Sequence, residues 1–477
     1  MVRYSPLGRL SSNAHTPRIA IIAIFTSLAV VSIASLLVLR GTDISARLHL
    51  FSSPPSEPEK VDATPSICPA IGPNNHFEQQ YGHELLQRSI AHEGSNRRLR
   101  EKIAKAQRGE DIRMAVVGGS VSAGHTLNDW RNIYFYRFLD WWNQQFPNGH
   151  HEIFQGAVPA TDSGYFAYCF DKHIPKDVDI VFVEFSLNDA SSLPCEMAKQ
   201  GSIVQAKMME SLVRNLLRLP RKPAVIMTSV FSFNVNEYLD GQESHLPISN
   251  YYDLPHISMK NALFDHINRH PDDLKGKLYN DGHHLSEWGH QMLSDMVSHY
   301  VERQICAMSD TVQPPLLDSY SYNESIPKYD MFTHRWQQNE FRELEPYCHT
   351  FSDQSYRPKE VDGWKFWNWQ NEKFYIVADE PGASVTFEVE ANQGVVYLYL
   401  LRSANYNLGN IWCWIGDDKE KGRELEGYWD KWYSVGVMTP VAEGLSQGQH
   451  LLHCELMNKT SHPDGGTHFR ILAVASG

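Results

Sequence analysis

The chain has 477 residues, a length typical of two or three domains that each bury a sizeable core. Hydrophobic residues make up 42% of the chain and charged residues 21%, which is ordinary for a folded protein and excludes a disordered one. Its net charge of -13 and its lack of a long Lys/Arg run argue against a nucleic-acid partner.

An uncharged apolar segment covers residues 19–39 near the amino terminus. At about 1.5 Å per residue it is long enough to cross a bilayer core of roughly 30 Å, so we expect a single membrane-spanning signal anchor. A cleaved signal peptide is the alternative, but its apolar part is usually only about 7–15 residues long. Arg3, Arg9 and Arg18 precede the segment with no acidic residue among them, which favours a type II orientation. The rest of the chain would then lie in the lumen of the secretory pathway (Golgi or ER) or at the cell surface.

Three features agree with a location outside the cytosol. The Pro/Ser-rich residues 51–73 are typical of a stalk between a membrane and a folded domain. Asn323 and Asn458 each begin an Asn-x-Ser/Thr pattern and are predicted N-glycosylation sites. The seven cysteines contain no CxxC pair and no zinc-like spacing, which favours disulfide bonds over a metal site. Their odd number leaves at least one cysteine free or paired with another chain.

Helices and strands alternate along the middle of the chain. A charged amphipathic helix is predicted over residues 83–109 and a short apolar strand over residues 112–117. In chain order there follow a helix over 132–146, a strand over 179–185, a helix over 202–219, a strand over 224–231, and helices over 258–269 and 286–306. This order predicts a three-layer α/β/α domain with a parallel sheet.

Beyond about residue 350 the sequence changes to strand-length apolar runs separated by turn residues, with no good helix. We therefore expect a separate all-β domain, resembling a sandwich. The predicted organisation is a cytoplasmic tail (1–18), a signal anchor (19–39), a stalk (40–75), the α/β domain (76–310), a connection (311–353) and the aromatic-rich β-domain (354–477).

Ser120 follows the first predicted strand inside a run of small residues, Gly-Gly-Ser-Val-Ser-Ala-Gly. A strand-to-helix turn there would lift Ser120 to the edge of the sheet and direct backbone N–H groups toward a developing oxyanion. The alternative is a glycine turn with a capping serine. A phosphate loop does not fit, because the lysine that would hold the phosphates is missing.

Asp281 and His284 stand three residues apart, just before a predicted helix that Ser286 would cap. One imidazole can then face a nucleophile while the carboxylate holds its other nitrogen, which makes the imidazole a base. A metal site formed by His283, His284 and His290 is the alternative, but its spacing is not a standard zinc spacing, and we predict no metal.

Asn188 follows the strand predicted over residues 179–185 and can direct its side-chain amide to the same place, although asparagine there is often only a turn former. The fragments around Ser120, Asn188, Asp281 and His284 together resemble the SGNH (GDSL-type) hydrolase superfamily over roughly residues 110–305.

The resemblance implies roles for these residues. Ser120 matches the nucleophile, Asp281 and His284 match the closing pair, and Asn188 matches the asparagine of the oxyanion hole, where the N–H of Ser120 would also donate. In the remaining block the oxyanion glycine aligns with Ala160, with Gly156 four residues earlier. Alanine still supplies an N–H, so the hole is retained if the backbone there does not require a positive φ.

The resemblance implies a serine esterase with no metal and no organic cofactor. The whole architecture is similar to membrane-anchored fungal and algal capsule-associated SGNH proteins. An acylated glycan or a small ester is the expected substrate, with acetyl as the expected acyl group. A glycan O-acyltransferase using the same triad and a non-catalytic glycan-binding surface protein are the alternatives.

Seven of the 12 tryptophans fall in the last third of the chain. Flat aromatic faces suit stacking on sugar rings, whereas tryptophans on alternate strand positions more often pack in a core or a domain interface. They are Trp364, Trp367, Trp369, Trp412, Trp414, Trp429 and Trp432.

Overall fold

The computed structural model describes residues 72, 74–191, 198–234, 240–270, 272–309, 326–333, 341–352, 356–369, 373–431 and 433–477. Residues Ile67–Gly477 belong to one compact unit. The predicted signal anchor (19–39) and Asn323 lie outside the described residues, and Asn458 is exposed. None of the helices in the described ranges has the length and apolar composition needed to cross a membrane.

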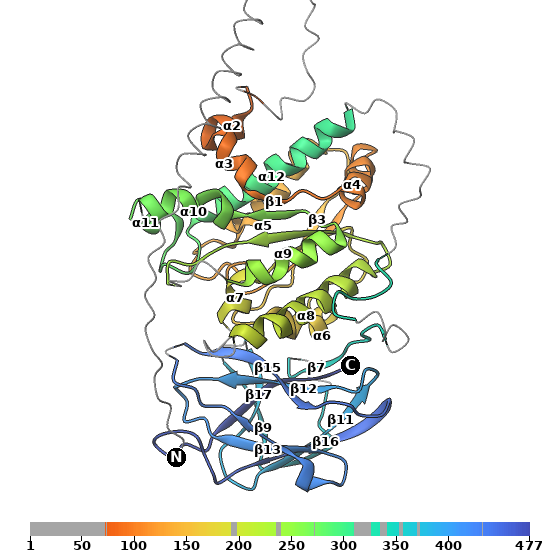
Figure 1. Ribbon diagram of the computed structural model, residues 1–477, viewed down its shortest axis with the longest axis vertical. Helices are drawn as coiled ribbons and strands as arrows, with labels where there is room; N and C mark the ends of the chain where they lie inside the picture. Colours follow the sequence, from red (N-terminus) through yellow and green to blue (C-terminus); the bar gives the residue numbers. More distant parts are fainter. Residues whose placement is uncertain are drawn as a thin grey trace, which may run out of the picture. The chain divides into compact units, whose positions relative to one another are not determined.

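Six strands form a mostly parallel sheet in the α/β domain, in the order β1-β6-β5-β4-β2-β3 (Figure 1). They are β1 (Ile90–His92), β2 (Arg113–Gly118), β3 (Glu152–Gln155), β4 (Ile180–Glu184), β5 (Ala224–Ser229) and β6 (His256–Ser258). Neighbouring strands are parallel except at one edge, where β1 pairs antiparallel with β6. The predicted α/β domain is therefore confirmed, and the expectation of a wholly parallel sheet is wrong at that edge.

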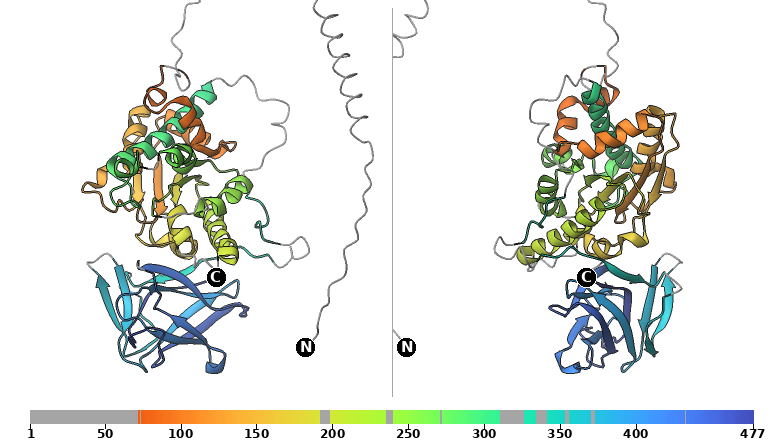
Figure 2. Two further views of the ribbon diagram at one scale, coloured as in Figure 1. Left: turned by 60° about the vertical axis from the view of Figure 1, so that its left-hand side comes forward. Right: turned by 90° about the vertical axis from the view of Figure 1, so that its right-hand side faces the viewer.

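Helices lie on both faces of this sheet (Figure 2). Strand residues alternate between two buried clusters: Val116 and Phe182 belong to one, and Val117 and Val183 to the other. The first cluster takes side chains from α2 (His76–Tyr81), α3 (His83–Arg88), α4 (Arg97–Gln107), α5 (Tyr134–Gln145), α10 (Met259–Arg269) and α12 (Glu287–Ser309). The second takes them from α6 (Ser163–Cys169), α8 (Ala198–Leu217) and α9 (Gly241–Tyr252). Two short helices, α7 (Ser186–Ser191) and α11 (Lys275–Leu278), lie in the connections.

The single helix predicted over residues 83–109 is wrong, because the chain forms α3, β1 and α4 there. Gly94 and Asn96 both take positive φ values, of +68° and +59°, which end any continuous helix. Between the helices, Ile90 pairs with Ile257 of β6. Pairing with a distant strand therefore overrides the local helical pattern.

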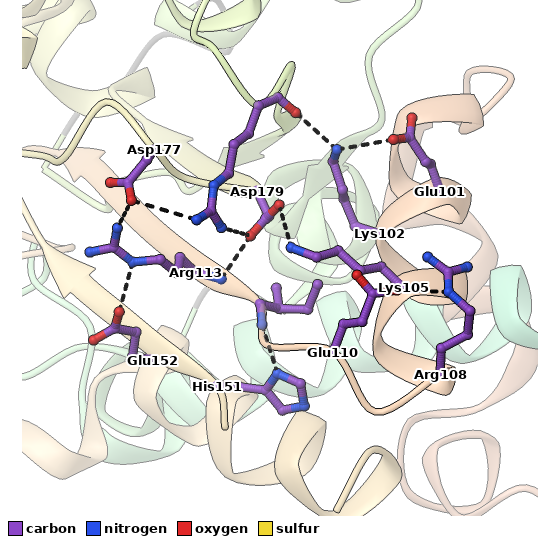
Figure 3. A network of polar contacts seen from close by, with 12 residues as sticks. Glu101, Lys102, Lys105, Arg108, Glu110, Arg113, His151, Glu152, Asp177 and Asp179 are labelled. Carbon is purple, nitrogen blue, oxygen red and sulfur yellow. Dashed lines mark hydrogen bonds and ion pairs between the residues drawn. The ribbon is translucent and has the colours of Figure 1, made fainter. Parts of the chain in front are cut away.

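A polar network lies at the amino ends of β2, β4 and β5 (Figure 3). At its centre the buried carboxylate of Asp179 accepts hydrogen bonds from the backbone N–H of Arg113 at 3.1 Å and from Lys105 Nζ at 3.1 Å. Arg221 Nη1 donates to the same carboxylate at 3.0 Å. The network ties the three strands together at the end opposite to their carboxyl ends, where open α/β sheets bind ligands.

Two antiparallel sheets form the β-domain (Figure 1). One has the order β15-β12-β17-β10-β9, with β7 also on β17, and the other β14-β13-β16-β11-β8. Their strands are β7 (Tyr347–Thr350), β8 (Glu360–Asp362), β9 (Lys365–Trp369), β10 (Lys373–Ala378), β11 (Ser384–Ala391), β12 (Val396–Arg402), β13 (Asn410–Ile415), β14 (Arg423–Glu426), β15 (Val435–Ala442), β16 (Gly448–Leu456) and β17 (Phe469–Ser476). The prediction of an all-β part is therefore confirmed.

Covalent and apolar contacts join the β-domain to the α/β domain. A disulfide links Cys169 of α6 to Cys348 of β7, and a second links Cys413 to Cys454 within the β-domain. Tyr399 of β12 is buried in the same cluster as the side chains of α6. Disulfide bonds, which the sequence analysis favoured, are therefore present in two pairs among the described residues.

Candidate active site

Ser120 lies just beyond the carboxyl end of β2, after two glycines that leave room for other side chains. A Cβ atom at Gly118 would lie 2.6 Å from Ser122 Oγ. A Cβ atom at Gly119 would lie 2.0 Å from Asn188 Oδ1. Only glycine fits at these positions, and the Asn188 side chain therefore packs directly against the backbone that precedes Ser120.

Strands β2 and β4 are neighbours at the point where the strand order reverses. Ser120 follows β2, and Asn188 follows β4. The crevice outside the carboxyl ends of two such strands is the usual binding site of an open α/β sheet. Topology alone therefore brings these two residues to one place.

The neighbouring Ser122 points into the interior instead. It is fully buried, and its hydroxyl donates to Glu184 Oε2 at 3.1 Å and lies 3.2 Å from the Tyr134 hydroxyl. Burial raises the pKa of Glu184 to about 7. Of the two serines in this turn, Ser120 is thus the one whose hydroxyl reaches the predicted base.

Asp281 and His284 lie in the loop between α11 and α12. Gly282, between them, takes a φ of +81°, and its carbonyl accepts a hydrogen bond from the Phe233 N–H at 2.9 Å. This hydrogen bond joins the loop to the segment that follows β5. Its side chains can then reach the carboxyl end of β2 from the side of β5.

The structure brings the three predicted residues within hydrogen-bond distance of one another. His284 Nε2 lies 2.9 Å from Ser120 Oγ, and His284 Nδ1 lies 2.7 Å from Asp281 Oδ2. With the Nδ1–H tautomer, His284 donates to Asp281 and accepts from the serine hydroxyl, which is the arrangement of a Ser-His-Asp triad. Their catalytic roles stay a prediction.

The carboxylate of Asp281 is ionised at neutral pH. Burial acts to raise its pKa, but hydrogen bonds from the backbone N–H and ring of His284 and from the His283 N–H outweigh this, and the pKa falls to about 2. The same N–H groups donate to Asp281 Oδ1 at 2.7 and 2.9 Å. A charged, firmly held carboxylate can stabilise an imidazolium on His284.

His283 and His125 flank His284 without replacing it. His283 Nδ1 lies 2.9 Å from Ser232 Oγ, and burial, together with the charge of nearby His284, lowers the pKa of His283 to about 4. The His125 ring approaches that of His284 edge-on, with centroids 4.5 Å apart. The sequence analysis missed His125, which was marked only by its place five residues after Ser120. In the structure the His125 N–H donates to the carbonyl of Ser120 at 3.0 Å.

Asn188 is held in place through its neighbour Asp189. Asp189 is buried, and its Oδ1 accepts from the Ser163 N–H at 2.9 Å. Its Oδ2 lies 2.7 Å from Nε2 of the buried His245 on α9. These contacts fix the start of α7, so the amide of Asn188 is positioned in advance, and His245 is a second residue that the sequence analysis missed.

Ala160 takes a φ of +61°, a left-handed conformation that costs an alanine about 1–2 kcal/mol. Its carbonyl accepts hydrogen bonds from the Tyr399 hydroxyl at 3.1 Å and from the Gly436 N–H at 3.2 Å. The condition that the sequence analysis set, a backbone without a positive φ, is therefore not met, but the two contacts from the β-domain hold the alanine in this conformation. No local pattern pointed to Tyr399 or Gly436, because Tyr399 lies 239 residues from Ala160 in sequence.

Gly156 is not available as an oxyanion donor, so this part of the prediction is wrong. Its N–H donates to the carbonyl of Val116 at 3.0 Å and continues the β2–β3 pairing. A Cβ atom at Gly156 would lie 2.5 Å from Ile174 Cγ2, so the glycine serves close packing. For the Ala160 N–H, by contrast, the hydrogen bonds of the described residues include no partner.

The loop that carries Ala160 is joined to the turn of Ser120, because the Val158 N–H donates to the Gly118 carbonyl at 3.0 Å. The site therefore gathers a serine and an oriented imidazole, and the predicted donors Asn188 and Ala160 lie on segments that contact the turn of Ser120. Across the residues that the structure describes, no group of three His, Cys, Asp or Glu side chains is arranged to hold a metal ion.

The fold is similar to that of a two-domain esterase active on acetylated mannans, one of whose crystal structures contains mannopentaose. The TM-score is 0.62 for both structures, at 20% and 18% sequence identity, covering 82% of this chain and 97% and 98% of the other. An acetylxylan esterase from Geobacillus stearothermophilus matches 40% of this chain and 94% of its own, at 13% identity and a TM-score of 0.33. No protein-family model and no curated protein matches the sequence. The chain therefore shares its two-domain fold with the esterase active on acetylated mannans.

Proposed function

We propose that the protein is a serine esterase of the SGNH type that removes acyl groups, acetyl above all, from glycans. The observation that carries the proposal is the pair of hydrogen bonds that joins Ser120 Oγ, the His284 ring and Asp281. The similarity in fold to an esterase active on acetylated mannans supports a glycan ester as the substrate class.

In the proposed reaction His284 Nε2 takes the proton of Ser120 as Oγ attacks the acyl carbonyl. The imidazolium is stabilised by Asp281 and returns its proton to the sugar oxygen, which leaves as an alcohol. Water, deprotonated by the same nitrogen, then attacks the acyl-enzyme and releases the acid and free Ser120.

Three donors would hold the negative charge of the tetrahedral intermediate: the N–H groups of Ser120 and Ala160, and the Asn188 amide. Each such donor is worth about 10²–10³ in kcat in measured cases. The fixed positions of Asn188, through Asp189, and of Ala160, through its carbonyl, support this assignment. Preorganised donors need no rearrangement when charge develops.

Solvent access favours hydrolysis over transfer of the acyl group to another sugar. The side chain of Asp281 is 44% exposed and that of His284 15% exposed, so water reaches the base. An acyltransferase must keep water away from its acyl-enzyme. An O-acyltransferase is the second candidate, and the test below detects it by the transfer of acyl groups to an added acceptor.

The test is to incubate the full chain with acetylated xylo- and manno-oligosaccharides and to measure acetate release, with and without an added sugar acceptor. A serine-directed fluorophosphonate should block the release and leave one adduct, which peptide mass spectrometry should place on Ser120. Acyl groups recovered on the acceptor would indicate a transferase. No acetate release and no adduct would contradict the enzyme assignment.

Tyr399→Phe should lower kcat for p-nitrophenyl acetate roughly 2- to 10-fold with little change in KM, since a hydrogen bond is worth about 0.5–1.5 kcal/mol. Without the Tyr399 hydroxyl, the carbonyl of Ala160 would be held by the Gly436 N–H alone, and the Ala160 N–H would be less firmly positioned. Glycine takes a positive φ without strain, so Ala160→Gly in the same chain should restore part of the lost kcat.

The matched control is Tyr397→Phe, two residues earlier on β12, where the hydroxyl bonds Tyr168 instead. It should leave kcat unchanged. Equal losses in both variants, or no rescue by Ala160→Gly, would mean that Tyr399 acts only through general stability.

A further inference from the structure

A cavity of about 400 Å³ lies where residues 158–161 of the α/β domain meet the end of the sheet formed by β9, β10 and β17. This volume is within the range of sites for small molecules, roughly 300–1,000 Å³. Tyr399 and Gly436, which hold the carbonyl of Ala160, line it together with Ala160 itself. The cavity thus shares one of its walls with the candidate active site.

Arg470 also lines the cavity, together with the aromatic side chains of Trp369, Tyr375 and Tyr406. The Arg470 guanidinium carbon lies 4.6 Å from the ring centroid of Trp367, 4.3 Å from that of Tyr406 and 5.9 Å from that of Tyr375. Of the lining rings, Trp369 and Tyr406 are 39% and 44% exposed, whereas Trp367 packs on Arg470 without lining the cavity. Such exposed flat faces bind the apolar faces of sugar rings.

The charged side chains among the described residues that line the cavity are all basic. Arg470 and Lys373 line it, whereas none of the described lining residues is Asp or Glu. The nearby carboxylate of Asp379 attracts Arg470 electrostatically, but it does not line the cavity and forms an ion pair with Lys365 at 2.6 Å. The described lining is therefore positive in a chain whose net charge is -13.

We infer that this cavity binds a uronic acid residue of the glycan whose acyl ester is held at Ser120. The planar guanidinium of Arg470, oriented by its aromatic neighbours, can donate two parallel hydrogen bonds to a sugar carboxylate. The exposed ring of Trp369 would stack on the sugar, and the Ala160 loop would connect it to the ester. The inference rests on the proposed function and narrows its substrate to acidic, acylated glycans.

The test compares a matched pair of non-acetylated oligosaccharides: an aldotetrauronic acid, a xylotriose that carries one 4-O-methylglucuronic acid, and the same molecule with its carboxyl group reduced to an alcohol. Binding of each to the wild-type chain is measured by isothermal titration calorimetry. We expect the acid to bind on the order of 10-fold more tightly, because hydrogen bonds to charged groups are the stronger ones. Arg470→Gln should abolish this preference, and Lys373→Gln should reduce it.

Lys419→Gln is the matched control, since Lys419 stacks on Trp414 in the other sheet of the β-domain and does not line the cavity. It should keep the full preference. Equal affinity for the acid and its reduced form, or an undiminished preference in both cavity variants, would overturn the inference. Because neither oligosaccharide is an ester, this outcome is independent of acetate release, which tests the proposed function separately.

Discussion

Ser120→Ala is expected to lower ester hydrolysis by a factor on the order of 10⁴–10⁶, as in triad enzymes that lose their nucleophile. The alanine has no group that can attack the acyl carbonyl, and His284 loses the proton donor that lies 2.9 Å from its Nε2. Acetate release and p-nitrophenyl acetate turnover measure the loss, and an unchanged melting temperature would show that the variant is folded.

The natural control is Ser122→Ala, two residues later in the same turn. This variant removes the buried hydroxyl that donates to Glu184 Oε2 at 3.1 Å, so we expect it to lower the free energy of unfolding by about 1–3 kcal/mol while keeping most of the activity. If Ser122→Ala lost all turnover while Ser120→Ala kept it, the nucleophile would be misassigned.

His284→Ala is expected to remove nearly all turnover, again by about 10⁴-fold or more, because one ring supplies both the base and the later acid. Asp281→Asn should lower kcat by about 10⁴-fold, because the amide oxygen would keep accepting from the His283 and His284 N–H groups while the amide NH2 donated to His284 Nδ1 and held the ring in the wrong tautomer. Steady-state kinetics with p-nitrophenyl acetate give both values.

His283→Ala provides the comparison within the same loop. Its ring contacts Ser232 and not Ser120, so the variant should retain most of its kcat. A loss in His283→Ala equal to that in His284→Ala would indicate that the loop as a whole, and not one imidazole, had been disturbed.

The central strands could be predicted from sequence because they are buried on both faces. β4, for example, is buried at every position and is therefore an unbroken apolar run. The short edge strands β1 and β3 could not be predicted, because they are three and four residues long and half-buried. Their strand conformation depends on partners far away in sequence, such as Ile257 for Ile90.

The same division applies to the candidate site. Ser120, Asp281 and His284 stand in short local patterns, so sequence alone could name them. Whether Ala160 could take the place of the family's glycine depended on Tyr399, which meets it only in the folded chain. Which of Ala160 and Gly156 has an N–H left for an oxyanion could likewise be seen only in the structure, where the Gly156 N–H donates to the carbonyl of Val116.

Some tryptophans of the β-domain are buried and others are exposed, and their spacing in the sequence does not show which are which. Trp364 is buried in the core of the β-domain, whereas Trp367 and Trp369 are 37% and 39% exposed on an edge strand. The sequence analysis weighed core packing against an exposed surface for these tryptophans. Both roles occur within the six residues from Trp364 to Trp369. An edge strand has no neighbour to cover its outer side chains, and sequence does not mark which strand lies at the edge.

The place of β17 in its sheet determines when the loop of Ala160 becomes fixed during synthesis. The ribosome makes β17 after every other described strand, yet it pairs with β7, β10 and β12 at once. The sheet that carries Tyr399 and Gly436 therefore cannot close around Ala160 until β17 has left the exit tunnel. A nascent chain that has completed its α/β domain would carry Ser120 and His284 but lack the contacts from Tyr399 and Gly436 that hold Ala160.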